Sequence, residues 1–281
     1  MYCQNLPISS FNLKNINVKL KYLDFGYGSW IKNEERVFEE LTASCRFLEK
    51  LSLSGQGTLS LKIIENICQN GQTLKILDLH ECEGLHFEEI KCIVMNCKGL
   101  VELNLDNCRS WAMSSLCAES INFMCANLTE SIRKLSLFHQ DDITDSHVET
   151  LLIRCNQITE LTISSIDITC NVATYISKYL SNTLVKLGLD YMQPNAPYIL
   201  VKLNELSMSK LEYVYLPNCP QDLYEDIELG FPSLKINDKC CHIALSYKDE
   251  EETPKYRFWD VYAKQIDLFT IVKPSEEEAD D

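Results

Sequence analysis

Histidine and cysteine are the residues best suited to metal binding or nucleophilic chemistry, and they come close together in two places. His80, Cys82 and His86 lie within seven residues, and residues 240–242 read Cys-Cys-His. Structural zinc needs two pairs of ligands, each pair spaced by a few residues, that converge tetrahedrally. Consecutive residues cannot readily bind one ion together, and Cys82 has a recurring structural position described below. We therefore predict no metal site and no cofactor.

Motifs for catalysis are missing from the sequence. It contains no G-x-S-x-G elbow, no H-E-x-x-H pair and no phosphate-binding glycine loop. With five histidines and fourteen cysteines, some Cys–His proximity is expected by chance. We predict a non-catalytic protein, with a Cys–His hydrolase as a remote alternative.

The charge of the chain narrows the classes of partner. Its 281 residues include 41 Asp and Glu against 26 Lys and Arg, which gives a formal net charge of −15. Nucleic acids and anionic membranes are bound through Lys and Arg, so we expect neither as a partner. The first twenty residues lack the pattern of a secretory signal, and no 18 apolar residues run together. We expect a cytoplasmic or nuclear location, or both.

A short phrase, leucine-x-x-leucine-x-leucine with conservative replacements, recurs along the chain. Its copies start at Leu20, Leu48, Leu74, Leu100, Ile132, Ile158, Leu184 and Leu211, and a shortened ninth starts at Leu234. The starts are 23 to 32 residues apart, most often 26. A period of this length is typical of leucine-rich repeats.

The apolar period changes between the phrases. Each phrase alternates like a strand, whereas Ile90, Val94 and Cys97 follow one face of a helix. The same spacing recurs in residues 37–45, 61–68 and 148–155. Strand and helix in regular alternation predict an α/β leucine-rich-repeat solenoid, a right-handed horseshoe of about eight full repeats plus a partial ninth.

Six of the fourteen cysteines occupy two recurring positions. One set follows the last leucine of a phrase by three residues, and the other precedes the next phrase by three: Cys82, Cys108 and Cys219, then Cys45, Cys97 and Cys155. Free cysteine is among the most buried residue types. We expect buried, reduced thiols at these positions, rather than a disulfide framework.

Several segments resemble a known family. LKILDLHECEGL (residues 74–85) and LVELNLDNC (100–108) resemble the cysteine-containing leucine-rich repeats of F-box proteins. FPSLKINDKCCHIA (231–244) and YRFWDVYAKQIDLF (256–269) are similar to the last repeat and tail of the S-phase kinase-associated F-box proteins. The resemblance implies the substrate-recognition subunit of an SCF-type ubiquitin ligase, which holds a target protein for ubiquitination.

The F-box, which binds the Skp-type adaptor in that family, is not found before the first phrase at Leu20. We therefore expect either part of a longer receptor or a repeat-only relative, and an adaptor as partner only if an F-box lies upstream. The alternative function is a free-standing scaffold or inhibitor without a ligase role.

The partner-binding residues are expected on the concave face, where side chains between the inward leucines point. We select Asp78, His80, Glu102, Asn104, Asp106, Phe138, Tyr213 and Tyr215. Three of them, Asp78, Glu102 and Asp106, form an expected acidic patch for a basic segment of the partner, and the two tyrosines form an aromatic anchor. The alternative is an ordinary solvated strand surface.

The predicted organisation has three parts. Residues 1–19 lead into the array, residues 20–245 form the solenoid, and residues 246–281 form a capping tail with an acidic disordered end. The aromatic part of the tail, including Phe258 and Trp259, is expected either to cap the last repeat or to return along the concave face.

Overall fold

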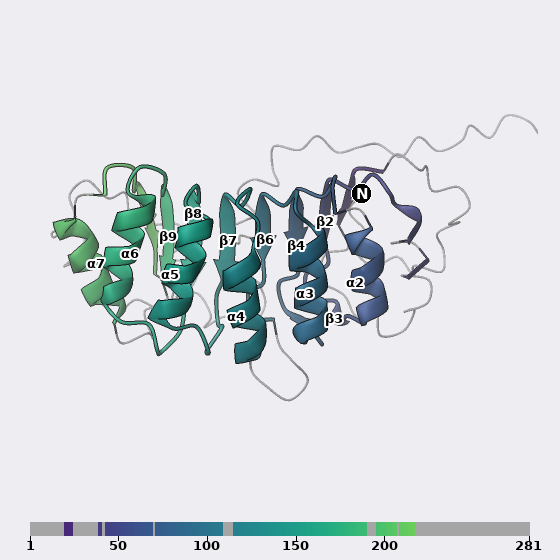
Figure 1. Ribbon diagram of the computed structural model, residues 1–281, viewed down its shortest axis with the longest axis horizontal. Helices are drawn as coiled ribbons and strands as arrows, with labels where there is room; N and C mark the ends of the chain where they lie inside the picture. The colour runs from purple at the N-terminus through teal and green to yellow at the C-terminus, as the bar shows by residue number, and fades with distance from the viewer. Residues whose placement is uncertain are drawn as a thin grey trace, which may run out of the picture.

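The computed structural model describes residues 20–24, 39–40, 43–69, 71–108, 115–189, 195–206 and 208–216. Within these residues the chain alternates between strands and helices, and Figure 1 shows the helices side by side in chain order along the long axis. The protein is therefore an α/β protein built on one large parallel sheet.

The large sheet has eight strands in the described part of the chain, in the order β1-β2-β4-β6-β7-β8-β9-β10. Their bounds are β1 Tyr22–Asp24, β2 Lys50–Ser52, β4 Ile76–Asp78, β6 Glu102–Asn104, β7 Lys134–Leu137, β8 Glu160–Ile163, β9 Lys186–Leu189 and β10 Tyr213–Tyr215. Each strand pairs in parallel with the next strand in this order. The central leucine or valine of each phrase pairs with the central residue of the neighbouring phrase. Two short strands, β3 (Gly57–Thr58) and β5 (Cys82–Glu83), form a separate parallel pair.

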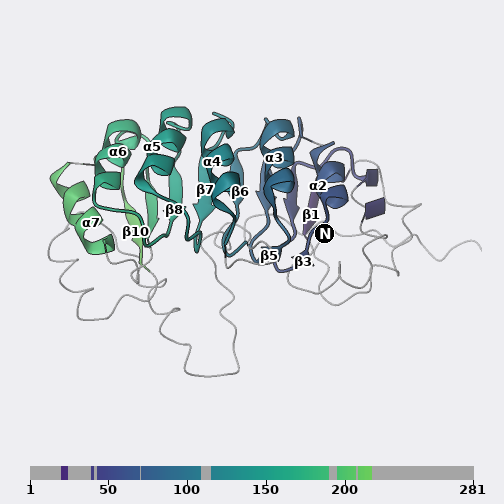
Figure 2. The ribbon, with the colours of Figure 1, turned by 60° about the horizontal axis from the view of Figure 1, so that its bottom comes forward.

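Six helices lie in the described residues, and they form a second layer on one face of the sheet (Figures 1 and 2). They are α2 Leu61–Cys68, α3 Phe87–Asn96, α4 Ala118–Asn127, α5 Asp145–Arg154, α6 Asn171–Leu180 and α7 Ala196–Glu205. Each helix packs against the next. Local sequence sets where they begin: at α3, for example, the main-chain N–H of His86 donates to Glu89 Oε2 over 3.1 Å, which completes a capping box.

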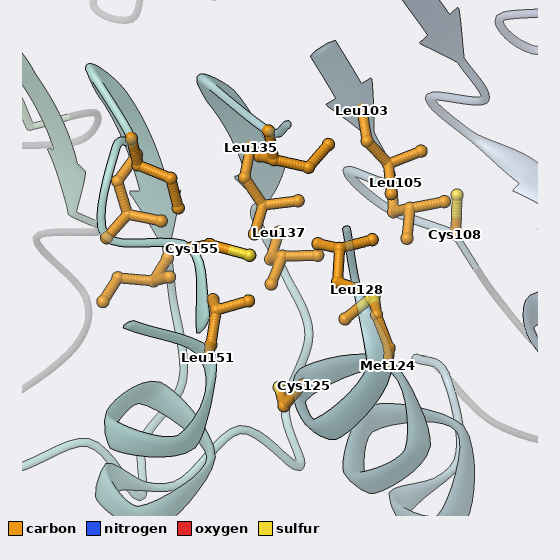
Figure 3. Close-up of a cluster of buried hydrophobic side chains, with 14 of the residues drawn as sticks. Leu103, Leu105, Cys108, Met124, Cys125, Leu128, Leu135, Leu137, Leu151 and Cys155 are labelled. Carbon is orange, nitrogen blue, oxygen red and sulfur yellow. The ribbon is translucent and has the colours of Figure 1, made fainter. Parts of the chain in front are cut away.

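The core lies between the two layers. Figure 3 shows Leu103, Leu105, Leu135 and Leu137 from the strand layer gathered with Met124, Leu128 and Leu151 from the helix layer. All of them are at least 98% buried. Burial of one such side chain contributes about 1.5–3 kcal/mol, so every unit is held mainly by its contacts with the strand and helix layers around it.

The recurring cysteines are buried where the structure describes them. Cys82 and Cys108 have no exposed surface, and Cys45, Cys97 and Cys155 are almost fully buried. This confirms the predicted burial of these five thiols, and Cys219 lies outside the described residues. Burial raises the pKa of the Cys45 and Cys155 thiols to about 11, which keeps them protonated at neutral pH.

The sequence-based expectations for the fold are confirmed at the level of strands and helices. A strand lies in each of the eight phrases, and the predicted helices at residues 61–68, 90–97 and 148–155 correspond to α2, α3 and α5. The ninth phrase, the lead-in at 1–19 and the tail at 246–281 with Phe258 and Trp259 lie outside the described residues, and the predicted helix at 37–45 is described only in part. In the described ranges, no helix is long and apolar enough to span a bilayer.

Candidate functional site

The face of the sheet opposite the helices carries polar side chains in three rows. Strand side chains alternate, so the residues on either side of the buried leucines point away from the helix layer. The first row contains Tyr22, Lys50, Ile76, Glu102, Lys134, Glu160, Lys186 and Tyr213, and the second contains Asp24, Ser52, Asp78, Asn104, Ser136, Thr162, Gly188 and Tyr215. The third row contains Ser54, His80, Asp106, Phe138 and Ser164. We call these three rows the polar sheet face.

Four residues of the first row form a charge ladder: Glu102, Lys134, Glu160 and Lys186. Lys134 Nζ lies 2.9 Å from Glu102 Oε1 and 3.8 Å from Glu160 Oε1, and Lys186 Nζ lies 3.3 Å from the same Glu160 oxygen. None of the four side chains is more than 19% exposed, so solvent screens these contacts only partly. The ladder has no net charge.

An aromatic ring follows the charge ladder on the last described strand. Lys186 Nζ lies 6.0 Å from the centroid of the Tyr213 ring, at the outer limit of a cation–π contact. Tyr213 and Tyr215 are partly exposed, with buried Val214 between them. The two tyrosines therefore add aromatic residues to the polar sheet face, and their role as an aromatic anchor stays a prediction.

The Asp78 carboxylate accepts hydrogen bonds from residues in and just after β2 and from a residue just after β4. Its Oδ2 accepts hydrogen bonds from the hydroxyls of Ser52 (3.1 Å) and Ser54 (2.6 Å), and its Oδ1 accepts one from the main-chain N–H of His80 (3.1 Å). An ionised carboxylate offers about four acceptor positions, so Asp78 keeps one beyond these three.

Asp106, which follows β6, also accepts hydrogen bonds from residues of a neighbouring strand segment. Its Oδ2 accepts a hydrogen bond from the Ser136 hydroxyl (2.8 Å), and its Oδ1 accepts one from the main-chain N–H of Phe138 (2.7 Å). The main-chain N–H of Asp106 donates in turn to Asn104 Oδ1 over 2.9 Å. Burial raises the pKa of the Asp106 carboxyl above its ordinary value, although the His80 charge and these hydrogen bonds oppose the shift.

His80 lies in an acidic environment. Its Nε2 is 3.2 Å from Glu81 Oε1, and its side chain is 13% exposed. Burial lowers the pKa of His80, but the hydrogen bond with Glu81 and the charges of Asp106, Glu81 and Asp78 raise it by more, so the net shift is upward. The acidic neighbours therefore favour the charged form of this imidazole.

The eight residues selected from the sequence all belong to the rows of the polar sheet face, but they do not form one cluster. Asp78, His80 and Asp106 interact with one another electrostatically. Glu102 belongs to the charge ladder, where Lys134 compensates it, so the expected acidic patch is divided. Asn104 is 96% buried, Phe138 stacks on His139 with a centroid distance of 4.1 Å, and the tyrosines lie four strands away from β6.

Sequence selection missed the other members of the charge ladder, and it missed Thr162. The signal was present: a charged residue of alternating sign occupies the same position in four successive phrases. In the described part of the chain, Glu160 Oε2 and Thr162 Oγ1 are buried side-chain oxygens that make no hydrogen bond. Such atoms are rare in native proteins and call for an explanation.

Two findings on the described residues concern possible metal ligands and the acidity of the thiols. Over the described ranges, no three His, Cys, Asp or Glu side chains are grouped so that they could hold a metal ion; residues 240–242 lie outside these ranges. Burial raises the pKa of Cys82 and of Cys108, and raises that of Cys125 to about 12, so these thiols are weak nucleophiles at neutral pH. No family model matches the chain.

Proposed function

We propose that this protein is a leucine-rich-repeat solenoid, a right-handed α/β horseshoe, that binds another protein on its polar sheet face. One observation carries the proposal: the helices occupy one face of an eight-stranded parallel sheet and leave the other face to rows of polar and aromatic side chains in register. In a curved array of this kind the face without helices is the concave one, and extended concave surfaces are what repeat proteins use to bind partners.

The role assigned to this surface is substrate recognition in an SCF-type ubiquitin ligase. The support is the resemblance of residues 74–85, 100–108, 231–244 and 256–269 to F-box leucine-rich-repeat proteins. The chain itself is non-catalytic in this proposal and positions the target protein in the cytoplasm or nucleus. A Skp-type adaptor is a partner of any form of the protein that carries an F-box upstream of Met1.

The partner is expected to be a protein segment with basic and polar side chains. Among the described residues, three hydrogen bonds reach the Asp78 carboxylate and two reach that of Asp106, so both carboxylates have further acceptor capacity for Lys or Arg of a partner. Glu102 contributes less than the sequence suggested because Lys134 already compensates its charge. Tyr213 and Tyr215 supply ring surface at the other end.

The second candidate function is a free-standing scaffold or inhibitor that uses the same surface without a ligase. A photo-crosslinking amino acid first identifies the partner, and deletion of the gene for this chain then separates the two roles. It replaces Phe138 on the polar sheet face in one variant and the exposed Tyr198 on α7 in a control variant.

A protein crosslinked at position 138 and not at position 198 is the expected partner. Under the ligase role, deletion of the gene for this chain raises the level of the crosslinked protein and removes its ubiquitin conjugates. Crosslinking without that change assigns the scaffold role. Equal crosslinking at positions 138 and 198 would contradict binding on the polar sheet face.

A further inference from the structure

Two buried oxygens on β8 lie next to a glycine on β9. Glu160 and Thr162 are two residues apart on the same strand, so both side chains lie on the polar sheet face, and Thr162 pairs in register with Gly188. Glu160 is 5% exposed and Thr162 is 3% exposed. We call these three residues the β8–β9 site.

Each of the two side chains has an oxygen that makes no hydrogen bond in the described part of the chain. Both lysines of the charge ladder contact Glu160 through Oε1, which leaves Oε2 without a donor, and Thr162 Oγ1 has no partner either. Leaving a buried acceptor unsatisfied costs roughly 1–3 kcal/mol, and more for a charged group. Two such atoms on the same face of β8 are positions at which a ligand could form hydrogen bonds with both side chains.

Gly188 makes room for the Thr162 side chain. A Cβ at position 188 would lie 2.7 Å from both Thr162 Oγ1 and Thr162 Cγ2, so the threonine leans over the main chain of β9 at the place where a side chain would stand. A side chain at position 188 would therefore force the Thr162 side chain to move, and the hydroxyl lies near the strand that also carries Lys186.

The charges around the site decide which donor it accepts. Lys134 and Lys186 contact the Glu160 carboxylate, so a third cation would meet their repulsion, and an anion would meet that of the carboxylate itself. A main-chain N–H offers one hydrogen and no acceptor, whereas the Thr162 hydroxyl can donate as well as accept. A primary amide is neutral and carries two N–H groups and a carbonyl oxygen, so it can donate to Glu160 Oε2 and form a hydrogen bond with Thr162 Oγ1 in either direction.

We propose that the β8–β9 site binds the side-chain amide of an Asn or Gln in the partner segment. This rests on the proposed binding of a protein segment to the polar sheet face. Both oxygens are buried in the unliganded chain, so binding includes a side-chain movement, and the flexible stems of Lys134 and Lys186 are able to supply it.

The test selects a displayed library of random 12-residue peptides on the full chain. The chain with Thr162→Val, which replaces the hydroxyl by a methyl group of similar shape, is compared with wild type and with Thr162→Ser, which keeps the hydroxyl. Peptides selected on wild type should carry Asn or Gln at one fixed position. We expect them to bind the Thr162→Val chain about tenfold more weakly and to bind the Thr162→Ser chain nearly as well as wild type.

A folding readout separates lost binding from lost structure. Thr162→Val removes an unsatisfied buried hydroxyl, so its thermal midpoint should equal or exceed that of wild type. Changing the Asn or Gln of a selected peptide to Asp, Leu or Lys should weaken binding to wild type and should weaken binding to Thr162→Val by less, because the amide keeps only its hydrogen bond to Glu160 Oε2 there.

The failing outcomes are distinct. One outcome overturns the amide inference and leaves the proposed function in place. In it, the selected peptides lose affinity for a chain with Asp78→Asn and Asp106→Asn, but they carry no fixed Asn or Gln, or they bind Thr162→Val as well as wild type. Selection of Lys or Arg at the fixed position also overturns it. If the library yields no saturable binder, both the amide inference and the proposed function are overturned. The same holds if every change on the polar sheet face leaves the affinity of the binders unchanged.

Discussion

The thiol of Cys108 donates a hydrogen bond to the main-chain carbonyl oxygen of Leu79, one strand earlier in the sheet, over 3.0 Å. Cys82 makes the equivalent bond to the carbonyl of Leu53 over 3.1 Å. The position three residues after a phrase therefore joins successive units, with a side chain small enough for the turn and a second hydrogen bond to a carbonyl that also accepts a main-chain N–H. This explains physically why cysteine recurs there.

Replacing Cys108 by alanine should destabilise the protein by about 1–3 kcal/mol, because it leaves the Leu79 carbonyl without this donor and opens a small cavity. The free energy of unfolding in urea measures the effect. The exposed Cys170 is the matched control, and Cys170→Ala should change stability by less than about 0.5 kcal/mol. Equal losses for the two variants would show that the thiol hydrogen bond has no special weight.

Replacing Lys134 by methionine should destabilise the protein by about 2–4 kcal/mol. The change leaves Glu102 without its cation and Glu160 with Lys186 alone, both in a poorly exposed environment. Glu102→Gln should cost less, since Lys134 keeps its contact with Glu160. Unfolding free energies of the two variants and of the double variant form the measurement, and strictly additive losses would contradict a coupled ladder.

Replacing Gly188 by alanine should destabilise the protein by about 1–3 kcal/mol, because the new Cβ would overlap Thr162 Oγ1 and Cγ2 at 2.7 Å. Thr162→Ala removes both of these atoms. In the Thr162→Ala background, Gly188→Ala should therefore cost much less, and thermal midpoints of the four proteins test this. Gly57→Ala is an unsuitable control, because the positive φ of Gly57 brings its own strain.

Stability should fall as pH rises from about 6 to 8, and His80 should account for part of the decline. The folded state raises the pKa of His80 above its ordinary value of 6.5, so its contribution is fully present below that pH and is lost as pH rises through the folded-state pKa. The measurement compares urea unfolding of wild type and His80→Gln at pH 6, 7 and 8. Parallel pH profiles for the two proteins would contradict this role for His80.

Much of the fold followed from the sequence, since strand and helix each repeat their own apolar period. The central leucines of neighbouring phrases meet in the sheet even where the spacing lengthens: phrases starting at Leu100 and Ile132 are 32 residues apart, yet Glu102 still pairs with Lys134. The additional residues fall outside the strands, so burial of the leucines keeps the register.

By itself, the sequence determined the α/β class, the eight strands and the burial of the recurring cysteines, because each depends on residues close together in the chain. Only the tertiary structure decided which polar groups of different units meet. Lys134 lies between Glu102 and Glu160, and Ser136 donates to Asp106 across 30 residues. Thr162 leans over Gly188, and no described residue forms a hydrogen bond with its hydroxyl. These contacts depend on side-chain direction and on lateral neighbours in the sheet, which a periodic pattern does not specify.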